Sequence, residues 1–383
     1  MTTPIFYYVD HTSRFVHNTG IQRCVRLLAM ALIDAGQPLV PVVWDRERGR
    51  FAAPSAQALA HLAQCHGPPI GAWHAWRDPG ACAQGWLLIV ELVRGLNNPT
   101  AEQLRAAAPG LRLAWLFHDA IPWQQAVRAG CPDAPAAVAH ARYMAAIAMD
   151  ARVFCNSRSS RIDLLCFLAE YGHQPVRQLA TRIRPLPLAE TFPTPRPSPP
   201  SIERSGPLRL LTVSTLERRK NHHALIKALV WLYSFGVQHW QLELIGWGAD
   251  HEIVAMLRRA RKVGLPLVWL GGVSDEQLHT AYAEADLCVY PSVQEGFGLP
   301  VVESLWHRRP CLCGDHGALA ELAEGGGCLT VNTQQWPAIA SALDQYIKNP
   351  LLRLKLGQQL EQRSYRTWKD VAQELLVGLH DLN

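Results

Sequence analysis

Several motifs that mark common nucleotide-dependent and metal-dependent enzymes are missing from this chain of 383 residues. No Gly-x-Gly-x-x-Gly follows the first expected strand, which argues against a nicotinamide dehydrogenase, and no Gly-x4-Gly-Lys-Ser/Thr marks a P-loop. No Asp-x-Asp, no His/Cys cluster with metal-ligand spacing and no Gly-x-Ser-x-Gly of a serine hydrolase occurs. A bound diphosphate would therefore have to be neutralised by cationic side chains and helix N-termini, without a metal.

Membrane spans, disulfides and leader peptides are not indicated either. The longest clean apolar run is Leu27–Ile33, far shorter than the roughly 20 residues of a transmembrane helix. The N-terminus lacks the basic segment and apolar stretch of a signal peptide. The ten cysteines contain no Cys-x-x-Cys pair and are expected to be reduced thiols. We expect a cytoplasmic protein, with peripheral contact at the inner face of the cytoplasmic membrane left open.

The charge balance is mild. The net charge is +5 and the arginines are spread along the chain. This favours anionic ligands or a lipid surface slightly, and it is too weak to indicate nucleic acid as a partner.

Short apolar segments alternate with helical patterns in both halves of the chain. Near-continuous apolar strands separated by helices are typical of parallel sheets covered on both faces. The sequence therefore predicts an α/β protein with two doubly wound, Rossmann-like domains. The expected strands begin at Ile5, Pro38, Trp86, Arg112 and Ala151 in the first half, and at Leu208, Trp240, Leu265, Asp286, Arg309 and Gly327 in the second.

A stretch rich in proline and serine separates the two halves. Residues 186–207 cannot hold a helix or a central strand and are predicted to be a linker. This gives an N-terminal domain over residues 1–185 and a C-terminal domain over residues 208–363. A helical pattern at about 364–383 is expected to pack back onto the first domain. Ligands of such folds bind at the carboxyl ends of the strands, so we expect a cleft between the domains.

The segment YPSVQEGFGLPVVES, residues 290–304, places two acids around a tight turn after an expected strand. Pro300 suits the first turn of a following helix, whose outward-pointing amides at Gly298 and Leu299 would form a diphosphate cradle. Glu303 suits a ribose diol and Glu295 the hydroxyls of a sugar. The alternative is an ordinary helix start, with acids that complement its dipole.

The segment VSTLERRKNH, residues 213–222, follows the first strand of the second domain. Lys220 as a point charge, and Arg219 or Arg218 as a planar fork, would bind phosphate there. A solvated basic turn is the alternative.

Two further segments of the first domain end an expected strand or start a helix. His118 and Asp119 end a strand of the first domain, where the histidine would polarise a sugar hydroxyl and Asp119 would orient it; a structural histidine is the alternative. Gly20 begins the first helix, with Thr19 as its expected N-cap, and could bring backbone amides to a phosphate.

Two turns of the second domain are less specific. The turn at Gly272–Val273 could offer backbone groups to a base, although capping by Ser274 explains most of its pattern. The segment LIGWGAD, residues 244–250, indicates only a tight turn near the cleft.

Taken together, these segments resemble retaining glycosyltransferase family 4, which has the GT-B fold. EGFGLPVVES is similar to the family's E-x7-E signature, VSTLERRKN to its phosphate-binding segment and LFHDAIP to its HDxxP strand end. VSDEQLHTAYAEADLCVYPS is similar to the stretch before the signature. The matches run in family order over roughly residues 15–310.

The resemblance implies the roles of individual residues. Glu303 would bind the ribose, and Glu295 with the amides of Phe297, Gly298 and Leu299 would hold the sugar and the diphosphate. Lys220 and Arg219 would neutralise the leaving diphosphate, His118 would touch the sugar, and the turn Gly272–Val273 would meet the base. Catalysis would thus rest on His118, Glu295 and Lys220.

The chain departs from the family pattern in two places. Many members have Gly-Arg where this chain has Ser214–Thr215, so the second cation must be Arg219 or Arg218. The glycine-rich loop of the first domain is reduced to residues 18–20, which leaves open whether Gly20 meets phosphate.

The implied activity is transfer of a hexose, with mannose or a deoxyhexose such as rhamnose favoured, with retention of configuration. The donor would be a nucleotide diphosphate sugar, GDP-linked rather than UDP-linked, and no cofactor or metal would be needed. The acceptor would be a glycan or lipid-linked glycan of O-antigen or lipopolysaccharide biosynthesis. Alternatives are another GT-B enzyme, such as a sugar-nucleotide epimerase or a phosphorylase, and a scaffold that binds a nucleotide sugar or glycan without catalysis.

Overall fold

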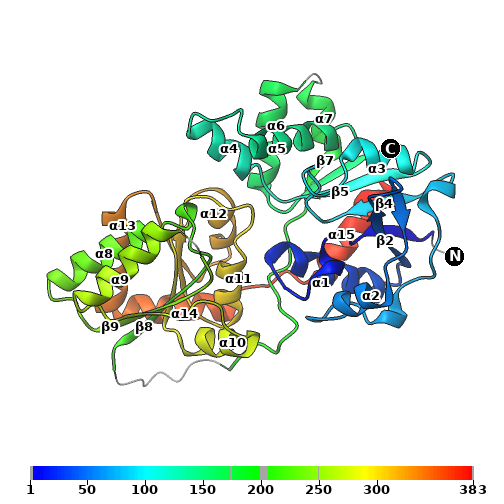
Figure 1. Cartoon of the computed structure of the whole chain (residues 1–383). Helices are drawn as coiled ribbons and strands as arrows, with labels where there is room; N and C mark the ends of the chain where they lie inside the picture. Colours follow the sequence, from blue (N-terminus) through cyan, green and yellow to red (C-terminus); the bar gives the residue numbers. More distant parts are fainter. Residues whose placement is uncertain (1–2, 173–174, 199–205, 249, 382–383) are drawn as a thin grey trace. The chain divides into compact units, whose positions relative to one another are not determined.

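The computed structural model describes residues 3–172, 175–198, 206–248 and 250–381 (Figure 1). The chain divides into a first unit, Met1–Ala189 with Arg366–Asn383, and a second unit, Glu190–Tyr365. Residues 186–198 form no helix or strand, and residues 199–205 of the predicted linker lie outside the described residues.

The first unit contains a seven-stranded sheet in the order β3-β2-β1-β4-β5-β6-β7. All neighbouring strands are parallel except β2 and β3, which are antiparallel. The five predicted strands are present, and the two edge strands β3 and β7 were not expected. The strands are β1 Ile5–Tyr8, β2 Leu39–Asp45, β3 Arg50–Ala52, β4 Trp86–Ile89, β5 Arg112–Phe117, β6 Arg152–Cys155 and β7 Ile183–Pro185.

The first helix starts and ends where the sequence predicts. Thr19 forms a capping box with Gln22 at the start of α1, and Gly36 follows its end with a φ of 82°. The helices are α1 Gly20–Asp34, α2 Ala56–Leu62, α3 Ala101–Ala107, α4 Ile121–Arg128, α5 Pro135–Ile147, α6 Arg158–Tyr171, α7 Val176–Arg182 and α15 Trp368–His380, with 3-10 turns at Thr12–Arg14, Ile70–Ala72 and Pro79–Ala81.

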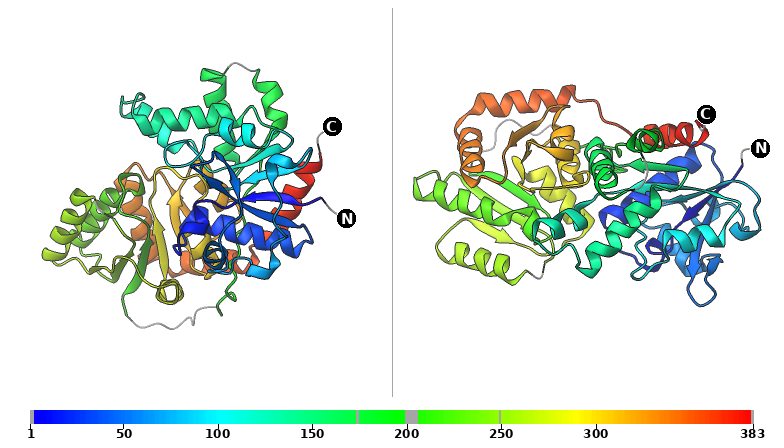
Figure 2. Two further views of the ribbon diagram at one scale, coloured as in Figure 1. Left: turned by 45° about the vertical axis from the view of Figure 1, so that its right-hand side comes forward. Right: turned by 90° about the horizontal axis from the view of Figure 1, so that it is seen from above.

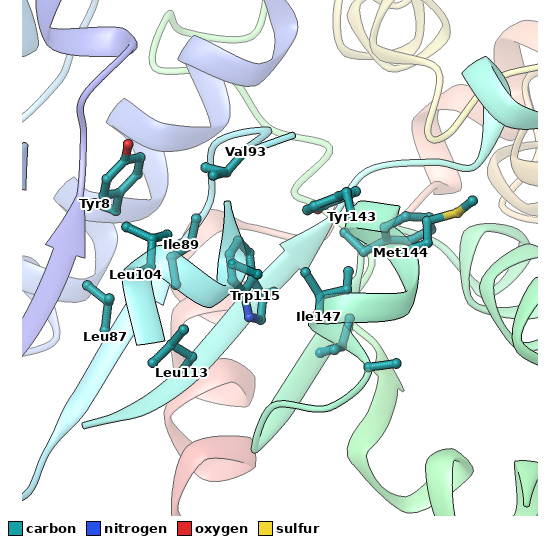
Figure 3. Packing of buried hydrophobic residues seen from close by; sticks show 14 of the residues in the cluster. Tyr8, Leu87, Ile89, Val93, Leu104, Leu113, Trp115, Tyr143, Met144 and Ile147 are labelled. Carbon is teal, nitrogen blue, oxygen red and sulfur yellow. The ribbon is translucent and has the colours of Figure 1, made fainter. Parts of the chain in front are cut away.

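The core of the first unit lies between the sheet and α5 (Figure 3). Trp115 is fully buried at the centre of β5, edge-on to Tyr143 of α5, with 6.0 Å between their ring centroids. Its indole N–H donates to Asp150 Oδ2 at 2.8 Å, which satisfies the polar atom of this large side chain. The apolar residues on this face of the sheet are thus covered.

The second unit contains six parallel strands in the order β10-β9-β8-β11-β12-β13. Every strand predicted for this half is present. The elements are β8 Leu208–Val213, a 3-10 turn η4 Arg218–Lys220, α8 His222–Ser234, β9 Trp240–Ile245, α9 His251–Lys262, β10 Leu267–Trp269, α10 Asp275–Glu284, β11 Leu287–Tyr290, α11 Leu299–Trp306, β12 Cys311–Gly314, α12 Gly317–Ala323, β13 Cys328–Val331, α13 Trp336–Lys348 and α14 Pro350–Gln362.

The order of the strands marks where a ligand would bind in each sheet. In the second unit the chain leaves β8 toward β9 on one side and returns to β11 on the other, so β8 and β11 flank the point where the strand order reverses. Open α/β sheets bind ligands at the carboxyl ends of the strands at such a point. The corresponding point of the first unit lies between β1 and β4.

The last helix of the chain completes the first unit. α15 packs on α1, as the red and blue helices show in Figures 1 and 2. Its Gly378 lies against Phe154 of β6, and Arg152 donates to the carbonyl of Asp381 at 2.5 Å. Within the described residues, no helix is long and apolar enough to cross a membrane.

A methyl group at Gly378 tests this packing. A Cβ there would lie 2.7 Å from the Phe154 ring, which is buried and cannot move freely. We expect Gly378→Ala to lower the free energy of unfolding by about 1–2 kcal/mol, because overpacking outweighs the gain in helix propensity. The measurement is chemical denaturation followed by circular dichroism.

Gly357→Ala is the matched control, because a Cβ at this helical glycine of α14 would meet no atom within 4 Å. It should be neutral or stabilising by up to about 1 kcal/mol. Equal effects of the two variants would contradict the contact between α15 and β6.

Candidate functional site

Lys220 lies beneath the loop that follows β8. It is the last residue of η4, and Asn221 then takes a left-handed conformation, with a φ of 58°, before α8 begins. The residue is only 8% exposed. Its ammonium group donates to Glu295 Oε1 at 2.7 Å and to the Tyr290 hydroxyl at 2.6 Å. A lysine of the β8 loop is thus joined to the carboxyl end of β11.

The structure distinguishes the two arginines that the sequence left open. Arg219 points toward Glu295, and its Nη1 lies 2.7 Å from Glu295 Oε2. The Arg218 side chain is 80% exposed and pairs with Glu252 at 3.1 Å, on the N-terminal turn of α9. Arg219 therefore shares the cluster of Lys220, and Arg218 does not.

Glu295 is the common counter-ion of this cluster. Burial raises the pKa of Glu295, but the charges of Lys220 and Arg219 together lower it further, and the net pKa lies below its ordinary value. The hydroxyls of Tyr290 and Ser292 also donate to its Oε1. Both carboxylate oxygens are thus engaged within the protein, and the predicted contact of Glu295 with a sugar stays a prediction.

The pKa of Lys220 is sensitive to a nearby anion. Burial, and then the neighbouring Arg219 charge, lower the pKa of Lys220, while Glu295 opposes this shift. Glu295 pairs with both cations, and Arg219 also pairs with the half-exposed Glu217. A diphosphate at this place would add negative charge and raise the pKa of Lys220 again.

The turn after Glu295 is built around Gly298. This residue has a φ of 107° and precedes α11, and a Cβ there would lie 2.7 Å from Leu319. Only glycine suits both the conformation and the close packing. The amides of Phe297, Gly298 and Leu299 stand at or before the helix start, which is where a helix attracts anions.

Glu303 is buried one turn further along α11. It is 7% exposed, and its Oε2 accepts a hydrogen bond from the Tyr282 hydroxyl at 2.6 Å. Tyr282 comes from α10, and its ring stacks on His307, with 5.0 Å between centroids. The ribose contact predicted for Glu303 is not tested by these bonds, which fix its carboxylate between α10 and α11.

Gly272 and Val273 form the turn between β10 and α10. Ser274 caps α10 in a capping box with Gln277, as the sequence predicts. The turn therefore lies at the carboxyl edge of the same sheet as Lys220 and Glu295, two strands from β8.

Sequence reasoning missed the two tyrosines that support the acids. Tyr290 and Tyr282 each donate to one of the two glutamates of the signature segment. Tyr290 is the last residue of β11, five residues before Glu295, and it begins the candidate segment of residues 290–304. For Tyr282 only its place on a helix before the next strand could have served as a signal.

His118 directly follows β5 in the first unit, and its ring is held by a backbone carbonyl. Its Nε2 lies 2.7 Å from the Val90 carbonyl oxygen, so this nitrogen carries the proton. Burial lowers the pKa of His118, which keeps the ring neutral near pH 7. The expected orienting residue, Asp119, accepts instead from the amide of Ile121 at the start of α4. The Val90 carbonyl thus holds the ring, and an orienting role of Asp119 stays a prediction.

Gly20 is the first residue of α1, and the loop before it is clamped by a buried cation. Arg26 is fully buried and donates to the His17 carbonyl at 2.9 Å and to Asn18 Oδ1 at 3.1 Å. Sequence reasoning missed Arg26 because it sits among apolar residues of the helix. A phosphate contact at Gly20 stays a prediction.

Two acids stand at the point where the strand order of the first unit reverses. Glu91 follows β4 and accepts from the amides of His11 and Thr12 at 2.7 and 2.6 Å. Burial raises the pKa of Glu91 to about 7. Asp10 follows β1 and pairs with Arg14 at 2.6 Å. Neither acid was singled out in the sequence, and their bonds fix the loop after β1.

The second unit matches a known family of enzymes. Residues 198–363 match the family model "Glycosyl transferases group 1", which covers most of the second unit and less than half of the chain. The chain is 26% identical over 240 residues to the serotype-specific mannosyltransferase WbdA of Escherichia coli, a match covering 60% of this chain and 29% of WbdA. It is 29% identical over 163 residues to the O-antigen chain mannosyltransferase B of Escherichia coli, covering 42% of each protein. The chain thus spans less than half the length of these two relatives.

Two solved structures resemble nearly the whole chain. Sucrose-phosphate synthase from Thermosynechococcus elongatus has a TM-score of 0.66 at 17% identity, covering 99% of this chain and 98% of that one. Anabaena HepE, in complex with UDP and glucose, has a TM-score of 0.65 at 16% identity, covering 98% and 99%. These likenesses confirm the predicted fold of two Rossmann-like domains. The family match confirms, for the second unit, the resemblance that its motifs indicate.

The ion cluster can be tested by its pH dependence. A carboxyl group whose pKa is lowered in the folded state stabilises the protein above its unfolded pKa, and this contribution disappears as the pH falls through the folded pKa. We expect Glu295→Gln to lower the free energy of unfolding at pH 7 by on the order of 3 kcal/mol, since buried Lys220 loses its counter-ion and partly buried Arg219 retains the half-exposed Glu217. The loss should shrink steadily below about pH 4. Urea unfolding at pH 7, 5 and 3.5 measures it.

Glu217→Gln is the control. Glu217 pairs with the same Arg219 at 3.1 Å, but its side chain is 49% exposed, so its removal should cost less than about 1 kcal/mol. If the two variants lose the same stability at pH 7, the buried cluster does not stabilise the second unit.

Proposed function

We propose that this protein is a retaining glycosyltransferase that moves a hexosyl group from a nucleotide diphosphate sugar to a glycan acceptor. The proposal proceeds from the match of the second unit to group 1 glycosyl transferases. The observation that carries it is the buried cluster of Lys220, Arg219 and Glu295 beside the helix start at Gly298. Two cations and a helix N-terminus converge where the strand order reverses, which suits a diphosphate.

The chemistry follows from where negative charge develops. In the transfer, the bond between the anomeric carbon and the diphosphate oxygen breaks, and its electron pair leaves with the diphosphate. Lys220 and Arg219 neutralise this charge, with the amides at Gly298 and Leu299. These groups do the work that a divalent cation performs in other transferases, so we propose a reaction without a metal.

Retention requires the acceptor to attack the same face that the diphosphate leaves. The acceptor oxygen forms the new bond to the anomeric carbon, and its proton passes to the departing phosphate oxygen. Glu295 does not suit a covalent nucleophile, because both of its oxygens are engaged by Lys220 and Arg219. The neutral ring of His118, fixed by Val90, suits a hydrogen bond to the donor sugar.

The substrates are proposed from the relatives. The two Escherichia coli relatives described above are named as mannosyltransferases, one of them of the O-antigen chain. We propose GDP-mannose or a GDP-linked deoxyhexose as the donor, and a glycan or lipid-linked glycan of surface polysaccharide as the acceptor. A peripheral contact with the membrane that carries such an acceptor belongs to the same proposal.

Nucleotide preference can be measured by thermal unfolding. A ligand that binds the native state at 100 times its Kd stabilises it by about 2.7 kcal/mol. This corresponds to a rise in Tm of about 5–10 °C for a unit of this size. We expect GDP to give the largest rise among GDP, UDP and ADP. A larger rise with UDP would contradict the proposed donor and leave the reaction class standing.

The role of Lys220 can be measured by donor turnover. Lys220→Ala should lower the rate of transfer about 100- to 1000-fold, since one preorganised group that stabilises developing charge contributes this much. Arg218→Ala is the control, because its exposed side chain faces Glu252, and it should keep the rate within about twofold. Full activity of Lys220→Ala would exclude the proposed role.

The same assay separates the alternative functions. Release of nucleoside diphosphate should depend on the acceptor for a transferase. An epimerase would convert the donor without an acceptor, and a phosphorylase would require free phosphate. A scaffold would bind the donor and release no product from any of a panel of nucleotide sugars.

A further inference from the structure

Trp247 is an exposed aromatic residue at the same edge of the sheet as the cluster of Lys220, Arg219 and Glu295. It lies between Gly246 and Gly248 in the loop after β9 and is 73% exposed. Its indole N–H has no hydrogen-bond partner within the part of the chain that the structure describes. An open aromatic face at this edge of the sheet can serve as a surface on which a base stacks.

The backbone of this loop is fixed on both sides. The Gly246 amide donates to the Gly271 carbonyl at 2.7 Å, and the Leu216 amide donates to the Trp247 carbonyl at 2.8 Å. A Cβ on Gly248 would lie 2.2 Å from Cβ of Leu216. The loop is therefore wedged between the loops that follow β8 and β10, and it holds Trp247 in one place.

The indole rests on the glycine of the neighbouring turn. A Cβ on Gly272 would lie 1.9 Å from Trp247 Nε1 and 2.1 Å from its Cε2. The ring thus packs directly on the Gly272 backbone, which leaves no room for any side chain there. Because 73% of the residue remains exposed, the indole is open to a ligand on the side away from Gly272.

The order of the strands places this ring beside the phosphate site. β9 lies between β10 and β8, so Gly272, Trp247 and Lys220 stand at the ends of three consecutive strands. Two strand spacings amount to roughly 10 Å. A ribose and its base extend over about this distance from a diphosphate, so a nucleotide held at Lys220 would carry its base toward Trp247 and Gly272.

We propose that Trp247 is the stacking platform for the nucleobase and that it favours a purine. The open indole offers a flat π surface to the base, while the backbone of Gly272 and Val273 meets the edge of the base. A bicyclic purine covers more of the indole than a pyrimidine does, so stacking favours GDP over UDP. This inference rests on the proposed function, because it assumes that the cluster of Lys220 binds the diphosphate of a nucleotide.

Calorimetric titration of the full chain with GDP, UDP and inorganic pyrophosphate tests the platform. Loss of one base–aromatic stack should weaken GDP binding by Trp247→Ala about 5- to 100-fold. UDP binding should weaken less, and pyrophosphate binding should stay within about twofold, because it has no base. Trp247→Phe should recover most of the GDP affinity. Gly272→Ala should behave like Trp247→Ala, since its Cβ displaces the indole.

Trp231→Ala is the matched control. Trp231 is 40% exposed on α8, and its ring neighbours are Phe235 and Trp336. Its loss should leave binding of all three probes unchanged.

The outcomes separate the two proposals. Unchanged GDP affinity in Trp247→Ala overturns the platform, while the transferase proposal stands. An equal loss for GDP and pyrophosphate also overturns it, because the variant then damages the phosphate site and not a base contact. If the parent protein binds neither nucleotide nor pyrophosphate, the proposed function itself fails, and the platform with it.

Discussion

The shared ion pair of Glu295 with Lys220 and Arg219 is the interaction on which the second unit's site depends. It joins the loop after β8 to the loop after β11, the two strands where the order of the sheet reverses. Backbone and hydroxyl bonds support it, since Val293 and Ser292 both donate to the Arg219 carbonyl. Two cations cannot lie side by side in a largely buried site without a carboxylate. Glu295 therefore allows Lys220 and Arg219 to lie next to each other.

This arrangement explains how a site can be both stable and ready for an anion. The cations are already oriented before a ligand arrives, and such preorganisation lowers the cost of stabilising charge as it develops. The glycine at the start of α11 and the buried Glu303 stand on the helix that follows directly, so their positions depend on the same turn. The Trp247 loop is bonded to Leu216 of the β8 loop, and its place is thereby set relative to Lys220.

In the first unit, buried polar groups also hold the loops at the strand ends in place. The side chain at the centre of this edge, the His118 imidazole, is neutral. Arg26 and Glu91 bind the backbone of the loops at the ends of the strands, and the Val90 carbonyl holds His118. Each bond satisfies a group whose burial would otherwise be costly. These bonds hold the loops at this edge in place, and the imidazole of His118 remains uncharged near neutral pH because it is buried.

The sequence by itself determined the alternation of strands and helices, the caps of α1 and α10, and the loops that carry the acids and cations. These features depend on local periodicity and on capping residues, which short segments encode. The edge strands β3 and β7 were not predicted, because strands of three residues are too short to show a hydrophobic periodicity. Only the tertiary structure chose Arg219 over Arg218, the Val90 carbonyl as a partner of His118, and Trp247 as the neighbour of Gly272. Each choice depends on contacts between loops far apart in the chain; Arg219 and Glu295, for example, are 76 positions apart. No local pattern records which way a side chain turns once those loops meet.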